Sequence, residues 1–317
     1  MLPFIVRLVA GLLLFAAPPA LAAPQGGSHL RPDDHRVAEV AWRLAVRGAP
    51  FCPAPHPLTG LLLHHLPEYA PADRPAFVRE HRLDRGPGIL SVVADSPAAA
   101  AGLRAGDVLL AVNGAAFPSP AAMAAERDRR RWRPMVEASE AQLEAALQAG
   151  PARLTVLRGG ESFETTLAPR PGCPMRIRLA RSPQNNAFAD GRYVVMTSAL
   201  LAFLESDDEL AAVLAHELAH NVLGHRQRLA DQRVPRGLLR GFGRNGARVR
   251  ATELEADRLS ASLLWAAGYD LDAAPRLWRR YHASFGGGDP LFRTHPGLGT
   301  RERLWEEAKV ALGSSRP

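Results

Sequence analysis

The five residues His216-Glu217-Leu218-Ala219-His220 constrain this chain more than any other stretch. On an α-helix, residues four apart are separated by about 400° of rotation and about 6 Å of rise, so both histidines project from one face and can bind a single ion. Glu217 is rotated by about 100° from His216, which places its carboxylate where it can take a proton from an attacking water. This HExxH pattern predicts a zinc site with a general base built in.

The residues around this pattern predict a buried helix from about Asp207 to about Arg226. Ser206, followed three residues later by Glu209, is a capping-box start. Apolar residues surround the helix and leave almost no polar side, which is typical of a core helix: Leu210, Val213, Leu214, Ala215, Leu218, Ala219, Val222 and Leu223. Polar groups buried in such a helix need partners, because an unsatisfied one costs about 1–3 kcal/mol. A metal ion supplies that partner.

The third ligand must come from further along the chain. Glu253 and Asp257 lie one turn apart on a helix predicted from about Val249 to Ala267, which Gly268 ends. We assign Glu253 as the third ligand and Asp257 as the carboxylate that orients a ligating histidine.

Two neighbouring residues receive other roles. Glu255 lies on the other side of its helix from Glu253 and is predicted to be a solvated ion-pair residue. His225 is about 180° around the first helix from His216, so we expect it to face away from the metal as a structural residue.

The first 22 residues are typical of a secretory signal. Arg7 closes a short n-region, Leu8 to Ala17 is apolar, and Ala20-Leu21-Ala22 is a cleavage site. The alternative is a retained anchor, but the apolar stretch is short for a span and Pro18-Pro19 interrupts it. No later stretch reaches membrane length. We therefore expect a mature chain without a transmembrane segment, exported to an oxidising compartment such as a bacterial periplasm.

Such a compartment favours a disulfide between the only two cysteines, Cys52 and Cys173. They flank a segment with the features of a separate domain. Closing a loop of this size contributes about 4–5 kcal/mol in the chain-entropy model.

The formal net charge of +7 comes almost entirely from arginine, since Lys309 is the only lysine. The arginines are mostly scattered and no nucleic-acid motif accompanies them, so we expect no nucleic-acid partner. Solvated faces are the favoured interpretation; peripheral contact with anionic lipid, or attraction of an acidic substrate, is the alternative.

Residues 76–170 contain a second unit. A strand from Gly88 to Val93 is followed by Ser96-Pro97-Ala98-Ala99, Gly102-Leu103-Arg104-Ala105-Gly106-Asp107 and Val112-Asn113-Gly114, and this order resembles a bacterial PDZ domain. A helix at 140–149 and a hairpin at 154–167 agree with it. Residues 117–138 are predicted to be an exposed helical elaboration whose arginines have no assigned role. In the preceding part, 23–75, we expect a helix from Asp33 or Asp34 to Val46, then a loop from Pro53 to Pro75.

PDZ domains bind an extended peptide tail as an added strand. The resemblance places the loop for the terminal carboxylate at Gly86, Gly88 and Ile89, although Pro87 removes one amide donor there. The alternative is a PDZ fold kept as a spacer or lid.

The final domain, 174–317, resembles the M48 family of zinc metallopeptidases. Four motifs carry the resemblance in order: Asn186-Ala187-Phe188-Ala189, the HExxH stretch, Glu253-x-Glu255-Ala256-Asp257, and Thr294-His295-Pro296 with Arg301 beyond it. The resemblance implies an α+β chain, with a mainly helical zincin-like domain carrying a small sheet beside the β-rich PDZ-like domain. It also implies one zinc ion per chain.

Further site residues follow from this resemblance. His295 is either a removable extra ligand, a substrate contact or a structural residue. In zincin peptidases an edge strand beside the motif helix binds the substrate backbone. Our candidate is the strand Tyr193-Val194-Val195-Met196-Thr197, and the segment from Arg228 to Arg248 is predicted to be a mobile cover.

The sequence therefore predicts a zinc-dependent endopeptidase of the cell envelope that cleaves unfolded or misassembled polypeptides, with Glu217 as general base. The alternative is a PDZ-bearing, chaperone-like binding protein whose zinc site is structural or blocked. An intact Glu217 argues against it, because a purely structural site needs no base.

Overall fold

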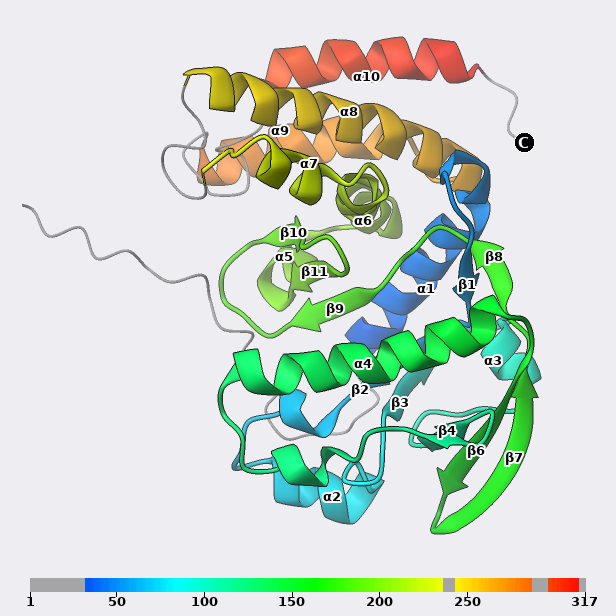
Figure 1. Ribbon diagram of the computed structural model, residues 1–317. Coiled ribbons are helices and arrows are strands. Elements are labelled where there is room, and N and C mark those ends of the chain that lie inside the picture. The colour runs from blue at the N-terminus through cyan, green and yellow to red at the C-terminus, as the bar shows by residue number, and fades with distance from the viewer. Residues whose placement is uncertain (1–31, 236–242, 287–295, 314–317) are drawn as a thin grey trace, which may run out of the picture.

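The computed structural model describes residues 32–235, 243–286 and 296–313. The chain has the expected α+β architecture, with a largely helical half above and a PDZ-like sheet below in Figure 1. Two predictions, the signal at 1–22 and the role of His295, concern positions outside the described residues.

The helices of the described residues begin with α1, which matches the predicted N-terminal helix. They are α1 (Pro32–Arg47), α2 (Arg74–His81), α3 (Pro97–Ala100), α4 (Arg129–Gln148), α5 (Ser198–Phe203), α6 (Asp207–Val222), α7 (His225–Asp231), α8 (Gly243–Ala267), α9 (Ala273–Phe285) and α10 (Leu298–Leu312). Within the described ranges, none of these helices combines the length and apolarity needed to cross a membrane.

The strands within the described residues form three sheets. They are β1 (His56–Leu58), β2 (Leu61–His64), β3 (Gly88–Val92), β4 (Val108–Val112), β5 (Ala115–Ala116), β6 (Ala152–Arg158), β7 (Glu161–Leu167), β8 (Arg170–Gly172), β9 (Ile177–Ala180), β10 (Ala187–Ala189) and β11 (Val194–Thr197). The largest sheet has the order β2-β3-β4-β6-β7 with β5 beside β4, the second has the order β10-β11-β9, and β1 pairs with β8.

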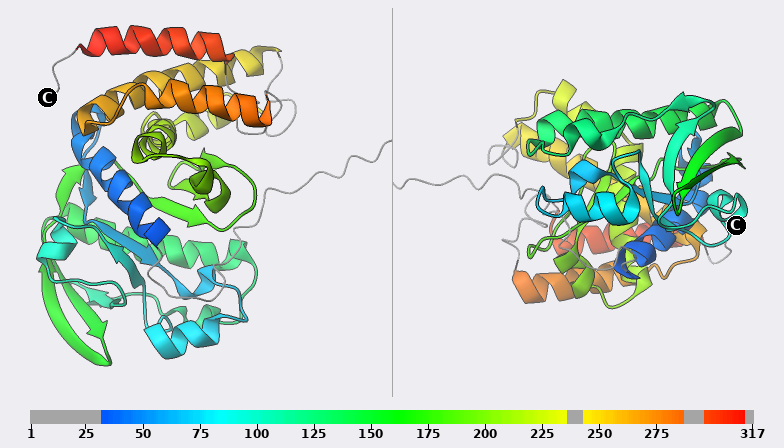
Figure 2. Two further views of the ribbon diagram at one scale, coloured as in Figure 1. Left: turned by 180° about the vertical axis from the view of Figure 1, so that it is seen from behind. Right: turned by 90° about the horizontal axis from the view of Figure 1, so that it is seen from below.

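Helix α6 is the centre of the helical half and packs against α8, α1 and α9 (Figure 2). Its first turn is capped by Ser206, whose Oγ accepts a hydrogen bond from the Glu209 amide at 3.2 Å. The predicted end at Arg226 is wrong, because α6 stops at Val222 and Gly224 adopts φ +62°, a left-handed conformation that ends helices. The chain then starts α7 in a new direction.

The prediction of a loop from Pro53 to Pro75 is also wrong. This segment contains β1 and β2, and β2 pairs antiparallel with β3 as the outer strand of the PDZ-like sheet. The sheet therefore begins before residue 76. Alternation in Leu61-Leu62-Leu63-His64 is weak because the strand is apolar on both faces, which hid it in the sequence.

Helix α4 joins the two halves. It is one helix from Arg129 to Gln148, not a short helix preceded by a separate elaboration. Leu143 and Leu147 pack into the core of the PDZ-like sheet. From another side of the same helix, Glu140 binds Arg178 of β9.

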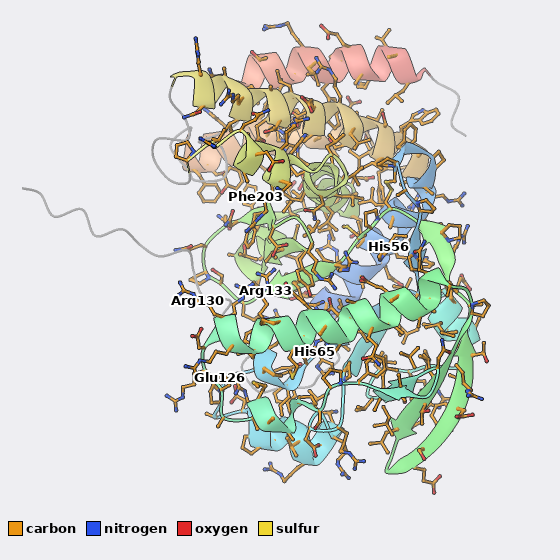
Figure 3. The ribbon with its side chains drawn as sticks, viewed as in Figure 1. His56, His65, Glu126, Arg130, Arg133 and Phe203 are labelled. Atoms are coloured by element: carbon orange, nitrogen blue, oxygen red, sulfur yellow. A yellow bond between two sulfur atoms is a disulfide. The ribbon has the colours of Figure 1, made fainter. Side chains whose placement is uncertain are left out.

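The N-terminal end of α4 reaches the helical half as well. Arg133, predicted to have no role, rises toward the segment before β11 (Figure 3) and donates to Asp190 at 2.7 Å. Tyr193 donates its hydroxyl to Glu140 at 2.6 Å. A part-buried ion pair and a buried hydrogen bond thus tie α4 to the segment between β10 and β11.

The two cysteines are bonded in the structure. Cys52 and Cys173 have Cα atoms 5.5 Å apart and close a loop with a sequence separation of 121. In the chain-entropy model, closing a loop of this size lowers the conformational entropy of the unfolded chain and stabilises the folded protein by about 4–5 kcal/mol.

Candidate metal centre

Three side-chain atoms converge between α6 and α8. His216 Nε2 lies 3.1 Å from His220 Nε2, and Glu253 Oε2 lies 3.3 Å from the first and 3.5 Å from the second. His216 and Glu253 are buried and His220 is partly buried. The structure thus brings together the three residues that the spacing arguments selected.

This triangle of donors fits a tetrahedral zinc ion. With zinc–nitrogen or zinc–oxygen bonds of about 2.0–2.1 Å, tetrahedral angles place neighbouring donors about 3.3–3.4 Å apart. The three observed separations of 3.1, 3.3 and 3.5 Å bracket that value. Two imidazoles and one carboxylate also match the donor set of catalytic zinc sites, which keep a fourth position open.

Glu217 lies on α6 beside this cluster and is only 7% exposed. It follows His216 directly in the sequence and contributes no atom to the donor triangle, which is formed by His216, His220 and Glu253.

His216 is oriented by a buried carboxylate. Asp257 Oδ1 lies 3.0 Å from His216 Nδ1, and Arg301 of α10 binds both Asp257 oxygens, at 2.8 and 2.6 Å. The Arg301 guanidinium also stacks on Trp278, 3.7 Å from the ring centre. Sequence reasoning assigned Arg301 no role; its place in the fourth motif was the available signal.

This surrounding shifts two pKa values. Burial raises the pKa of Asp257, but Arg301 and His216 outweigh burial and hold it well below its usual range. Burial lowers the pKa of His216, yet its contacts with Asp257 and Glu253 outweigh that effect and raise it to about 10 in the metal-free protein. A metal ion binding at His216 must therefore displace a proton.

The helical wheel predicted that His225 faces away from the site, but the structure places it against the site. The turn at Gly224 brings it back, so that His225 Nδ1 lies 2.8 Å from His220 Nδ1. Its other nitrogen, Nε2, lies 3.3 Å from Glu255 Oε2, and Arg228 donates to the same oxygen at 2.7 Å. Glu255 is an ion-pair residue, but its partners connect it to a candidate ligand.

The candidate substrate strand needs correction. Val194 to Thr197 form β11, which is buried and pairs with β9 on one side and β10 on the other. A strand with two partners cannot accept a third. The strand at the edge of this sheet and in contact with α6 is β10, which contains Phe188, 38% exposed.

The prediction of the carboxylate loop at Gly86, Gly88 and Ile89 is also wrong, because the strand that begins there already has a partner strand on each side. Gly88 lies on β3 and faces both His64 of β2 and Val108 of β4, while Ile89 is buried in the core. The outer strand is β2. Residues of β2 and α4 line a cavity of about 120 Å³, whose wall is completed by β1, by α1 and by residues 175–178 of the other half.

The segment predicted to be a mobile cover is partly helical. Residues 225–231 form α7, and α8 starts at Gly243, before the predicted Val249. The intervening positions 236–242 are outside the described residues.

Together, the helix pair and its donor set define a metal site of the HExxH class with a glutamate as third donor. The protein-family model of peptidase family M48 matches residues 165–242 and 245–307, and a PDZ domain model matches residues 88–123. The later part of the chain thus matches peptidase family M48, and a PDZ domain match lies ahead of it.

Curated relatives agree with this assignment. The chain is similar to a putative beta-barrel assembly-enhancing protease of Vibrio cholerae, 28% identical over 155 residues covering 39% of this chain and 32% of that protein. It is also similar to the mitochondrial metalloendopeptidase OMA1 of Schizosaccharomyces pombe, 31% identical over 153 residues covering 41% of this chain and 45% of that protein. The chain thus spans less than half the length of either relative.

A solved structure resembles the PDZ part. The HtrA3 PDZ domain bound to a phage-derived ligand is 20% identical, covers 37% of this chain and 89% of that chain, and has a TM-score of 0.27. The family model remains the basis for the PDZ assignment.

Proposed function

We propose that this chain is a zinc-dependent endopeptidase that cleaves unfolded or misassembled proteins in the cell envelope. The observation that carries the proposal is the donor triangle of His216, His220 and Glu253, with Glu217 next to it on the same buried helix. Export through the predicted signal supports the location, as does the disulfide.

The residues divide the chemistry between them. His216, His220 and Glu253 would hold a zinc ion, which would supply Lewis acidity toward the scissile carbonyl. Glu217 takes a proton from the attacking water and passes it to the leaving amine nitrogen, so one carboxylate serves as base and then as acid. Asp257 holds His216 with its Nε2 directed at the donor triangle.

The substrate backbone is proposed to pair with β10. This strand lies beside α6, and among the described residues it pairs only with β11, which leaves its other edge without a strand partner there. Extended polypeptides bind such edges through main-chain hydrogen bonds, which suits unfolded substrates.

The PDZ-like domain is proposed to select substrates by binding extended tails at β2, next to α4. Hydrolysis needs only the later domain, because every proposed donor follows residue 173. Deleting the domain is a poor test, since Arg178 would lose its buried partner Glu140. Measuring tail peptides that compete with full-length substrates but not with short ones is a sharper test.

Two isosteric variants test the peptidase assignment. Glu217→Gln keeps side-chain size and leaves all donors in place, so the purified protein should retain about one zinc per chain while cleavage of unfolded casein falls roughly 10²–10⁴-fold. Glu253→Gln replaces an anionic donor with a neutral amide, so zinc affinity should fall as well.

Arg153→Gln, an exposed change on β6, is the matched control and should leave both quantities unchanged. Wild-type turnover in Glu217→Gln would contradict the proposal. Zinc binding without any cleavage by the wild-type protein would favour the binding-protein alternative.

A further inference from the structure

On the side away from the donor triangle, His220 reaches a carboxylate through a second histidine, whereas His216 reaches one directly. The nitrogen of His220 that belongs to the donor triangle is Nε2, so its Nδ1 points away from the triangle. The atom that meets it, at 2.8 Å, is Nδ1 of His225, a side chain that is only 2% exposed.

Elementary hydrogen-bond chemistry determines the proton positions along this contact. A histidine that offers the Nε2 lone pair to a metal must carry its hydrogen on Nδ1. Two ring nitrogens 2.8 Å apart share one hydrogen, so His220 is the donor and His225 Nδ1 the acceptor.

The neutral His225 then carries its own hydrogen on Nε2. That atom lies 3.3 Å from Glu255 Oε2, an acceptor that cannot donate when ionised. Arg228, three residues after His225 on α7, binds the same oxygen at 2.7 Å and keeps the carboxylate charged and in place. All donors and acceptors along the chain from Arg228 to His220 are therefore matched.

We propose that His225 is a positioning residue for the metal site, and that it relays the orienting effect of Glu255 to His220. The relay selects the tautomer of His220 that binds metal and fixes the plane of its ring. The inference rests on the proposed metal site, and it assigns α7 a task that neither the HExxH pattern nor the third ligand requires.

The chain offers a discriminating pair of substitutions at this position. In His225→Asn, the amide oxygen can occupy the place of Nδ1 and accept the hydrogen bond from His220. In His225→Leu, a side chain of similar bulk fills the space without an acceptor. A structural role for His225 predicts similar behaviour of both in the metal site, whereas the relay predicts a difference.

The first measurement is zinc affinity by chelator competition, beside urea unfolding of each metal-free protein. His225→Leu should bind zinc about 10–100-fold more weakly than wild type. His225→Asn should recover most of that loss. His65→Asn, which changes another buried histidine in the PDZ-like half, should leave zinc affinity unchanged whatever it does to unfolding.

Spectroscopy gives a second readout that is independent of turnover. In the zinc-loaded protein, long-range nitrogen–proton NMR spectra should show His220 protonated at Nδ1 and His225 protonated at Nε2. The absorption spectrum of the Co²⁺-substituted protein should change in His225→Leu and be restored in His225→Asn.

Undiminished zinc affinity in His225→Leu, or a His225 protonated at Nδ1, would overturn the relay. A wild-type protein that binds no zinc would instead overturn the proposed function on which the relay rests. Weak zinc binding by both His225 variants, with equal loss of unfolding free energy, would also contradict the relay and indicate a structural role.

Discussion

The two histidines of the motif are supported by residue sets of the same chemistry in different surroundings. We call Asp257 and Arg301, which support His216, the inner arm. We call His225, Glu255 and Arg228, which support His220, the outer arm. His216 is held by Asp257 and Arg301, whose side chains are 0% and 3% exposed. His220 is held through His225 by Glu255 and Arg228, whose side chains are 39% and 38% exposed. Each arm ends in a carboxylate–arginine pair, but one pair is in the core and the other is at the surface.

This difference in exposure separates two effects of a supporting ion pair: its contribution to folding stability and its effect on the metal site. An ion pair in the core is costly to break, because the partner left behind is a buried charge. A half-exposed pair is screened by water and contributes little to folding. The inner arm therefore ties the metal site to global stability, whereas the outer arm adjusts the site at little cost to the fold.

The largest effect is expected for Asp257→Asn. Removing the charge leaves Arg301 buried without its anionic partner, which typically costs about 3–5 kcal/mol. Urea unfolding of the metal-free variant should show this loss, together with weaker zinc binding. If the variant has the same urea midpoint of unfolding as the wild type, the inner arm does not contribute to global stability and the contrast between the arms fails.

The unfolding free energy contributed by Asp257 should depend on pH. The change should be smaller than the loss in Asp257→Asn, and its sign is defined. Because Arg301 holds the pKa of Asp257 below its ordinary value of 3.8, the contribution of Asp257 to unfolding free energy is complete above about pH 4. It is lost as the pH falls through the depressed value. The gap between wild type and Asp257→Asn should thus be widest near pH 5 to 6 and shrink below pH 4. Because Asp257 also raises the pKa of His216, the gap should narrow as well when the pH rises above about 6.5. A gap that widens as the pH falls below 4 would reverse this assignment.

A change at Gly224 should act on the outer arm only. An added Cβ meets no atom within 4 Å, but the residue has φ +62°, where alanine costs about 1–2 kcal/mol. Gly224→Ala should therefore lower unfolding free energy by that amount and weaken zinc binding, since the turn places His225. Gly114→Ala, at φ +82° with equally open space in the PDZ-like half, is the matched control and should leave zinc binding unchanged.

Glu255→Gln should have the smallest effect on folding. Its pair with Arg228 is more than a third exposed, so the loss of unfolding free energy should be about 0–1 kcal/mol and smaller still in 1 M salt. Zinc affinity should nevertheless fall measurably, by less than in His225→Leu. A salt-independent loss as large as that of Asp257→Asn would make the two arms equivalent.

The parts of the site that sequence reasoning identified depend on local geometry. His216 and His220 share a helix face, as do Glu253 and Asp257, and helical spacing alone places each pair. The M48 and PDZ resemblances were confirmed by family models. The disulfide partners followed from cysteine count and compartment.

The parts that it missed depend on breaks in local geometry or on long-range pairing. His225 was misplaced because the wheel was continued through Gly224, which was available as a helix-ending signal. The outer strands β2 and β10 were missed because strand order in a sheet depends on contacts between distant segments. Arg133 received no role because its partner, Asp190, is 57 positions away.

Helix α4 connects the PDZ-like half of the molecule to the helical half. Its apolar side belongs to the PDZ-like core, while Glu140 is bound to Arg178 of β9. Strand β9 lies beside β11, and β11 beside β10. A tail that shifted α4 within its own domain would either pull on this sheet or break buried ion pairs. The two halves are therefore coupled through α4, so a displacement of this helix would be transmitted through β9 and β11 to the edge strand β10.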